Sequence, residues 1–339
     1  MEREYIGQNQ PRLELSKNQN KTKDVVKTRK RIAFLMFGTF LLSLFFLLYT
    51  NFKNDKVTFS PESLTSSVSD IFSGSFTSMD ISLVDEPKMK NPQELEALLL
   101  PIMENSQGSS SSWGIWIEVL GDGFIYTNNE NELFPAASLL KLPLTAKFYE
   151  KIQTGELDKN EEWIIKQSDK QGGNGMLVSM TAGSKIDYGA LAHYCLNLSD
   201  NTAFYIINSI LGRNSLESII ASYGMNNTSF EKDTTNTQDI ALFFKSLEEG
   251  KLLNEEYKQI FLRDLTNTPF DDFIPAGIPS GIDAPHKVGI EAAGISDAGI
   301  VYTPEKKILM VFLSKGLSRE NATEKISKMA LETYWYLMQ

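Results

Sequence analysis

Three short polar strings carry the residues of this chain that could do covalent chemistry. In chain order they are Ser138-Leu139-Leu140-Lys141, Ser199-Asp200-Asn201 and Lys287-Val288-Gly289. A serine hydroxyl is a weak nucleophile until a neighbouring base removes its proton, and a lysine three residues further along a helix lies on the same face. The first string therefore predicts an activated serine. The other two supply hydroxyl, amide and cationic groups that could steer protons and substrate.

Each string is common by itself. A second Ser-x-x-Lys occurs at Ser229–Lys232, inside a polar stretch. Ser138 differs because a mostly apolar stretch follows it, which predicts a helix that begins at or near Ser138 and runs into a core. The free N–H groups of such a helix start would face a developing negative charge. The structural alternative is that Ser138 only caps the helix and that Lys141 is a solvated charge.

The other two strings also lie at the ends of predicted elements. Ser199-Asp200-Asn201 separates two apolar stretches that predict helices, residues 191–198 and 203–211. Lys287-Val288-Gly289 opens a series of predicted strands, where a glycine on an edge strand would let a ligand backbone approach closely. The alternative for Lys287 is a solvent-facing strand residue. The predicted strands are residues 114–119 and 124–128, joined at Gly121-Asp122-Gly123, and then 288–293, 299–302 and 308–314.

Taken together, the strings resemble the SxxK, SDN and KTG motifs of class A β-lactamases and penicillin-binding proteins. Gly173-Asn174-Gly175 resembles the loop before the SDN string, and residues 274–279 resemble the approach to the KTG strand. The resemblance covers most of residues 91–339. It implies an α/β (α+β) β-lactamase/transpeptidase-like fold, with an antiparallel sheet flanked by helices and an all-helical lobe that holds Ser199. We expect a helix over residues 93–104 and another over 321–337 that packs on the sheet.

The resemblance also implies catalytic roles. Ser138 would be the acylated nucleophile, Lys141 its base, and Ser199 the group that passes a proton to the leaving nitrogen. Lys141 can act as a base only if its pKa is lowered, and burial and the nearby Lys287 both act in that direction.

The remaining implied roles concern binding. Asn201 would hold the amide side chain of the substrate, and Lys287 and Gly289 would contact substrate at the strand edge. The backbone N–H groups of Ser138 and Ile290 would form the oxyanion hole. Asp200 is expected to brace its loop.

The sequence departs from the family pattern in two places. Class A β-lactamases carry a Glu-x-x-Leu-Asn pattern whose glutamate activates the water that clears the acyl-enzyme. The corresponding stretch here, residues 223–235, is short and lacks that pattern; its one glutamate, Glu231, has a different context. Val288 stands where the family has Thr or Ser, which removes a hydrogen bond worth about 0.5–1.5 kcal/mol. Acylation is therefore expected, and fast hydrolysis of a β-lactam is not.

The N-terminal part of the chain predicts a membrane anchor. Residues 1–31 carry nine Lys and Arg against four Asp and Glu, and residues 32–50 contain an uncharged, apolar stretch. Basic residues on the N-terminal side place that side in the cytoplasm, so the chain is expected to cross the cell (plasma) membrane once, through residues 32–50. Residues 51–90 would be a flexible extracytoplasmic tether for the domain at 91–339. The alternative, a cleaved signal peptide, lacks a small-x-small cleavage site.

Composition excludes several other classes. The whole chain has a formal charge of −10, and the part outside the basic tail has −15, which argues against a nucleic-acid partner. Cys195 is the single cysteine and His193 and His286 are the two histidines. No internal disulfide is possible, no metal-ligand spacing is present, and we expect no metal or other cofactor. Cys195 is expected to be buried.

The leading hypothesis is a membrane-anchored acyl-serine hydrolase that acts on small-molecule β-lactams or on D-Ala-D-Ala-type cell-wall (peptidoglycan) peptides. The alternative is a non-catalytic protein that binds the cell wall or a partner and retains the fold. An unrelated esterase is disfavoured because the sequence has no Gly-x-Ser-x-Gly elbow. The sequence leaves the oligomeric state open.

Overall fold

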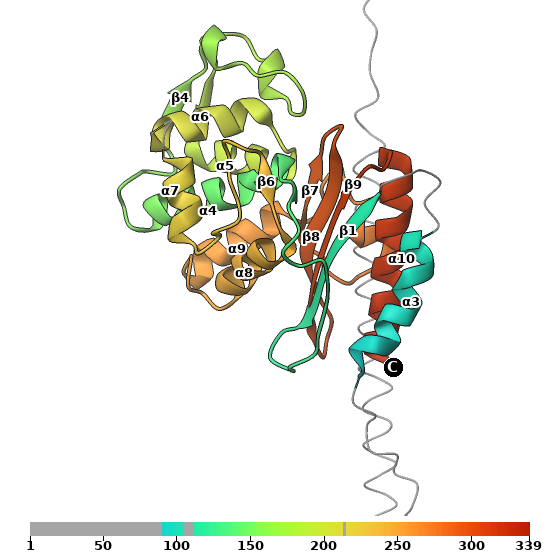
Figure 1. Ribbon diagram of the computed structural model, residues 1–339. Helices are drawn as coiled ribbons and strands as arrows, with labels where there is room; N and C mark the ends of the chain where they lie inside the picture. The colour runs from blue at the N-terminus through green and yellow to red at the C-terminus, as the bar shows by residue number, and fades with distance from the viewer. Residues whose placement is uncertain (1–89, 105–110, 213–214) are drawn as a thin grey trace, which may run out of the picture. The chain divides into compact units, whose positions relative to one another are not determined.

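The computed structural model describes residues 90–104, 111–212 and 215–339. A five-stranded antiparallel sheet with the order β2-β1-β9-β8-β7 lies at its centre (Figure 1). The strands are β1 (Ser112–Val119), β2 (Ile125–Asn128), β7 (His286–Ile290), β8 (Gly294–Tyr302) and β9 (Lys307–Lys315). The predicted hairpin and the three C-terminal strands are confirmed, and β7 is an edge strand, as the third string required.

Two strand boundaries differ from the prediction. β7 ends at Ile290 rather than at residue 293, and β8 begins at Gly294, five residues before the predicted start. The cause is a tight turn, in which the N–H of Glu291 donates to the carbonyl of Gly294 at 3.0 Å. This turn places Glu291 directly after the strand that carries Lys287.

The two faces of the sheet are covered by different layers. In β9, Ile308, Met310 and Phe312 pack into one apolar core, and the alternate residues pack into the other, as expected for a strand buried on both sides. The first core is closed by α3 (Pro92–Glu104) and α10 (Arg319–Met338), which lie side by side on one face (Figure 1). Both helices were predicted, and Ser318 caps the second, its hydroxyl accepting from the N–H of Asn321 at 3.3 Å.

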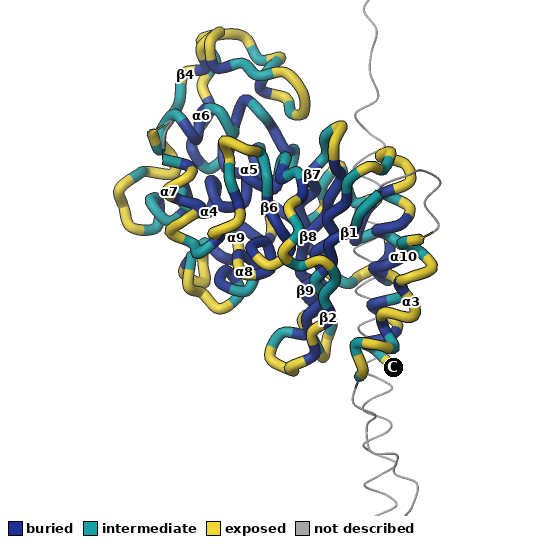
Figure 2. Tube along the Cα trace, viewed as in Figure 1, coloured by how far each residue is buried: buried dark blue, intermediate teal, exposed yellow. Residues whose placement is uncertain are grey.

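A mainly helical lobe covers the other face. Its buried interior is continuous with the sheet (Figure 2), and Cys195 is buried there, as predicted. The lobe is not all-helical, because β4 (Glu162–Ile164) and β5 (Lys185–Asp187) form a short ribbon in it. Its helices are α4 (Lys141–Gln153), α5 (Tyr188–Asn197), α6 (Asn201–Leu211), α7 (Leu216–Ser222), α8 (Thr237–Glu248) and α9 (Glu255–Asp264).

A second small ribbon ties the chain before Ser138 to a distant segment. β3 (Phe134–Pro135) pairs antiparallel with β6 (Thr234–Thr235). This pairing brings the residues just before β6 next to the start of the segment that carries the predicted nucleophile.

The predicted basic tail, anchor and tether, residues 1–31, 32–50 and 51–90, lie outside the described residues except for Lys90. Among the helices that the structure does describe, none combines the length and the apolar character needed to cross a bilayer.

Candidate active site

The predicted nucleophile lies in a tight turn that leads into α4. Residues Ala137–Leu140 form the 3₁₀ turn η1, and the α-helix proper begins at Lys141, so Ser138 is not a helix cap. The Nζ of Lys141 donates to the Oγ of Ser138 at 2.9 Å. Ala137 has a φ of +44°, a conformation that costs a non-glycine residue about 1–3 kcal/mol. The residue before the nucleophile is therefore strained and must be held by its surroundings.

The second string ends the short connection between α5 and α6, and its last residue, Asn201, is the first residue of α6. The Nζ of Lys141 donates to the carbonyl of Ser199 at 2.9 Å and to its Oγ at 3.2 Å. The same Nζ donates to Oδ1 of Asn201 at 2.7 Å, and the Asn201 amide donates to the carbonyl of Gly172 at 2.8 Å. Asn201 thus holds the amine of Lys141.

Asp200 braces the loop, as predicted. One of its carboxylate oxygens accepts from the N–H groups of Met176 and Leu177 at 2.6 and 2.9 Å. The other caps α6 by accepting from the N–H of Ala203 at 2.9 Å. Because this carboxylate is fully buried, its hydrogen bonds fix the turn that presents Ser199.

The third string reaches the same serine from the sheet. The Nζ of Lys287 donates to the Oγ of Ser199 at 3.0 Å and to the carbonyl of Val288 at 3.3 Å. Lys141 and Lys287 are only 3% and 2% exposed, so the alternative of two solvated lysines is wrong. Val288 packs into the apolar core on the α10 side of the sheet and offers the cavity no polar side chain.

Gly289 allows another segment of the chain, rather than a ligand, to pack closely against β7. A Cβ on Gly289 would lie 3.1 Å from the carbonyl oxygen of Ala136 and 3.3 Å from Cγ of Leu139. The glycine therefore lets β7 pack directly against the segment that holds the nucleophile, whereas the sequence suggested only the approach of a ligand.

The two buried amines have unusual protonation equilibria. Burial lowers the pKa of Lys141 to about 8, although Cys195 and Asp200 act in the opposite direction. Burial and the charge of Lys141 lower the pKa of Lys287 to about 7. Near neutral pH the pair therefore gives up protons readily, which is the condition that the role of Lys141 as a base requires.

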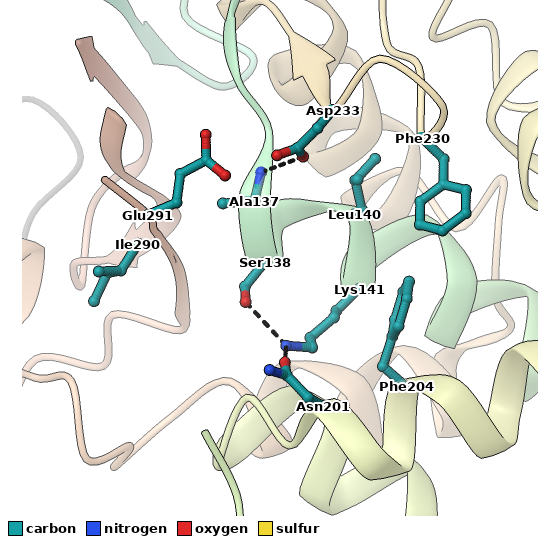
Figure 3. A pocket seen from close by; sticks show the side chains of 10 residues that line it. All are labelled: Ala137, Ser138, Leu140, Lys141, Asn201, Phe204, Phe230, Asp233, Ile290 and Glu291. Carbon is teal, nitrogen blue, oxygen red and sulfur yellow. Dashed lines mark hydrogen bonds between the residues drawn. The ribbon is translucent and has the colours of Figure 1, made fainter. Parts of the chain in front are cut away.

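A cavity of about 310 Å³ opens above Ser138 (Figure 3). Four of the predicted site residues line it, namely Ser138, Lys141, Asn201 and Ile290. Ser199 and Lys287 are not in its lining but are hydrogen-bonded to Lys141 or to each other. The remaining lining residues are Ala137, Leu140, Phe204, Phe230, Asp233 and Glu291.

Two of these lining residues are carboxylic acids that the sequence did not single out. The Oδ1 of Asp233 accepts from the N–H of Ala137 at 2.9 Å. Burial and the neighbouring Asp233 carboxyl raise the pKa of Glu291 to about 7. The available signals were weak: Glu291 directly follows the expected oxyanion residue Ile290, and Asp233 lies in the short stretch where a catalytic glutamate was sought.

Two aromatic rings were also missed. Phe204 and Phe230 lie with their centroids 6.0 Å apart, and the Phe204 ring is 5.9 Å from Nζ of Lys141. They form an apolar wall of the cavity beside Lys141 (Figure 3). Nothing in the spacing of these residues distinguishes them from core aromatics.

Glu231 is not among the residues that line this cavity. Its side chain is exposed, and its backbone N–H donates to the carboxylate of Glu217 at 2.7 Å. The serine of the second Ser-x-x-Lys, Ser229, does not line the cavity either, and its hydroxyl also donates to Glu217, at 3.0 Å. Within the part of the chain that the structure describes, no group of His, Cys, Asp and Glu side chains is arranged to hold a metal ion.

The comparisons with known proteins agree with this geometry. The sequence model of the beta-lactamase enzyme family matches residues 93–337. The chain belongs to this family. Its fold and family together support a serine β-lactamase-like hydrolase in general terms. A comparison of this chain with curated proteins found no significant match.

Several solved structures share the fold. PBP-A has 21% identity and a TM-score of 0.67 over 72% of this chain and 96% of its own. A β-lactamase from Sphaerobacter thermophilus has 20% identity and a TM-score of 0.66 over 71% and 96%. The TLA-1 extended-spectrum β-lactamase has 16% identity and a TM-score of 0.67 over 74% and 100%. At these identities the likeness establishes the fold of this β-lactamase-family domain and not its substrate.

Proposed function

We propose that this chain is a membrane-anchored acyl-serine hydrolase that acts through Ser138 on β-lactams or on D-Ala-D-Ala-type cell-wall peptides. One observation carries the proposal: the Ser138 hydroxyl lies 2.9 Å from a buried amine of lowered pKa, and that amine and a second one both contact Ser199. A solved structure of a PBP-A variant is described as an acyl-enzyme complex with penicillin G, so the shared fold is compatible with such an intermediate.

The proposed reaction follows from these contacts. Lys141 in its neutral form takes the proton of Ser138 while Oγ bonds to the substrate carbonyl carbon. The carbonyl oxygen becomes an oxyanion, which the N–H groups of Ser138 and Ile290 would stabilise. The carbon–nitrogen bond then breaks, and the proton passes from Lys141 through Ser199 to the leaving nitrogen. Water must finally cleave the ester to release the acyl group.

The last step is expected to be slow with a β-lactam. Of the two carboxyls in the cavity lining, Asp233 already accepts from the N–H of Ala137, and burial and Asp233 raise the pKa of Glu291 to about 7, so that Glu291 is protonated in about half of the chains at neutral pH. The side of the cavity next to Lys141 is formed by Phe204 and Phe230, which offer water no hydrogen bond. Both features favour a long-lived acyl-enzyme.

The test is covalent labelling of the purified full-length chain with a fluorescent penicillin, with intact mass measured over time. The expected result is one adduct per chain. A second assay compares the release of D-alanine from a peptide ending in D-Ala-D-Ala with the hydrolysis of a chromogenic cephalosporin. If the chain neither takes up penicillin nor hydrolyses the peptide or the cephalosporin, the proposal is rejected in favour of a non-catalytic binding protein that retains the fold.

The anchor is part of the proposal. The uncharged stretch within residues 32–50 follows a tail of net charge +5, so we infer one membrane crossing with the hydrolase domain outside the cytoplasm. Protease added to intact cells should release a fragment that begins within residues 51–90. Complete protection of the domain, followed by digestion after lysis, would contradict this topology.

A further inference from the structure

Two carboxyl groups meet beside Ala137, the residue before the proposed nucleophile. Asp233 and Glu291 both line the cavity, and Figure 3 shows their carboxyls next to the Ala137 backbone. Asp233 comes from the segment just before β6, and Glu291 is the first residue after β7. Two parts of the chain that are distant in sequence therefore converge on the point where the nucleophile begins.

Asp233 holds the strained end of the nucleophile segment. Its carbonyl accepts from the N–H of Ala136 at 3.0 Å, and its side chain accepts from the N–H of Ala137 at 2.9 Å. The left-handed conformation of Ala137 persists only if such contacts over-determine it. Because the next peptide carries the N–H of Ser138, Asp233 sets the direction of one proposed oxyanion donor.

Glu291 is attached to the other proposed donor. It follows Ile290 directly, and the turn that contains it is closed by its own N–H on Gly294. In Figure 3 its carboxyl points toward the carboxyl of Asp233, and this neighbour, together with burial, raises the pKa of Glu291. Two carboxyl groups can form a hydrogen bond only when one of them carries a proton. A proton on Glu291 would therefore let the pair connect the two segments that bear the proposed oxyanion donors.

The charges around the pair agree with this arrangement. Burial and Asp233 raise the pKa of Glu291 to about 7, so Glu291 loses its proton around neutral pH. The other charged groups of the surrounding elements have partners of their own or face solvent. Lys141 on α4 and Lys287 on β7 are both directed to Ser199. Lys315 on β9 is paired with Glu132, and Asp297 on β8 is paired with His286. Glu231 and Lys232 are exposed.

We propose that Asp233 and Glu291 are positioning residues that share one proton and thereby align the two oxyanion N–H groups, so that loss of this proton slows acylation of Ser138. The inference rests on the proposed acyl-serine function. After ionisation the two carboxylates repel each other, and the turn after Ile290 moves away from Ala137. The oxyanion donors then lose the alignment on which their effect depends.

The experiment measures the acylation rate of the full-length chain by a fluorescent penicillin, in detergent, from about pH 5.5 to about pH 9.5. Glu291→Gln keeps a hydrogen-bond donor toward Asp233 but cannot ionise. Its rate relative to the unmodified chain should increase about tenfold between pH 6 and pH 9, as expected when the titration near pH 7 is removed. Glu291→Ala, which can make no hydrogen bond to Asp233, should be acylated more slowly than Glu291→Gln at every pH. Glu231→Gln, an exposed neighbour outside the cavity, should follow the unmodified chain.

Several outcomes would overturn the inference. Superimposable pH profiles of Glu291→Gln and the unmodified chain would do so, provided that thermal melting shows both to be folded. A variant that changes only the loss of the adduct, and not its formation, would make Glu291 a base for hydrolysis rather than a positioning residue.

A third case separates this inference from the proposed function. If the unmodified chain takes up no penicillin at any pH, the proposed function fails by itself. The protonation of Glu291 is then measured directly, from the pH dependence of the carboxyl ¹³C signals of glutamate-labelled protein. The signal that is missing in Glu291→Gln is assigned to Glu291. Titration of Glu291 near pH 7 would support the shared proton, and titration in the ordinary range of a glutamate, near pH 4.3, would overturn it.

Discussion

The proposed catalytic cluster (Ser138, Lys141, Ser199, Asn201 and Lys287) and the 223–233 loop are built very differently. The cluster joins η1, the α5–α6 connection and the edge strand β7, and both of its amines are buried and hydrogen-bonded. The loop carries its one glutamate, Glu231, on the surface and turns an aromatic ring, Phe230, toward the cavity. The groups proposed to form an acyl-serine thus belong to the packed core, whereas the 223–233 loop provides no glutamate in the cavity to hydrolyse it.

The largest effect is expected from removal of the nucleophile. Ser138→Ala should abolish covalent labelling by a β-lactam, because the other Ser-x-x-Lys, at Ser229, has its hydroxyl engaged by Glu217, and neither residue lines the cavity. The measurement is the intact mass after prolonged exposure to penicillin. Ser229→Ala is the matched control and should label normally. Formation of an adduct in Ser138→Ala would show that another residue is the nucleophile.

The next effect concerns the base. Lys141→Ala should slow acylation by roughly 10²–10⁴-fold, the usual contribution of a positioned base. Lys147 lies on the same helix and pairs with Glu150 at the surface, so Lys147→Ala should acylate at the normal rate. The comparison uses second-order rate constants and melting curves of both variants. Equal acylation rates in the two folded variants would show that Lys141 is not the base.

The lowered pKa of Lys141 predicts a pH dependence. Its pKa is about 8, so the neutral, basic form becomes more abundant as the pH rises and is scarce in acid. Acylation of the unmodified chain should therefore increase about tenfold per pH unit from pH 5 to pH 6.5, below the range in which Glu291 ionises. Stopped-flow labelling across this range is the measurement. A flat profile would contradict a neutral Lys141 as the base.

A smaller effect is expected where the two halves of the site touch. Gly289→Ala would place a Cβ 3.1 Å from the carbonyl oxygen of Ala136, so β7 and the nucleophile segment would have to separate by a few tenths of an ångström. Such overpacking typically costs about 1–3 kcal/mol of stability. We expect a lower melting temperature and an acylation rate reduced about tenfold, since the oxyanion donors lie on these two segments. Unchanged acylation with lowered stability would show that the contact is only structural.

The sequence predicted those parts of the fold that have strong local patterns. The hairpin, α3 and α10 and the order of the C-terminal strands follow from apolar periodicity and turn residues. The start of β8 was missed because residues 294–298 read as Gly-Ile-Ser-Asp-Ala, whose polar members are buried by contacts from elsewhere. The 3₁₀ turn at Ser138 was missed because its first residue, Ala137, is hydrogen-bonded to Asp233, a residue far away in the chain.

For the site, the sequence supplied the residues that act through local spacing or through motifs. Lys141 was found from its distance to Ser138, and Ser199 and Lys287 from the motifs around them. Glu291 and Phe230 could not be found in this way, since they reach the cavity only through the pairing of β7 with β8 and of β3 with β6. The direction in which the pKa of a carboxyl shifts likewise depends on neighbours that only the folded chain brings together.

The lifetime of the acyl-enzyme tests the central contrast most directly. The full-length chain is acylated with penicillin, excess drug is removed by rapid gel filtration, and the fraction of chain carrying the adduct is followed by intact mass. We predict that the adduct outlasts the time of the separation and that less than one equivalent of penicillin is hydrolysed per chain in that time. Hydrolysis of several equivalents per second would contradict the account, because the cavity would then contain an efficient base for water that the 223–233 loop and its neighbours do not show.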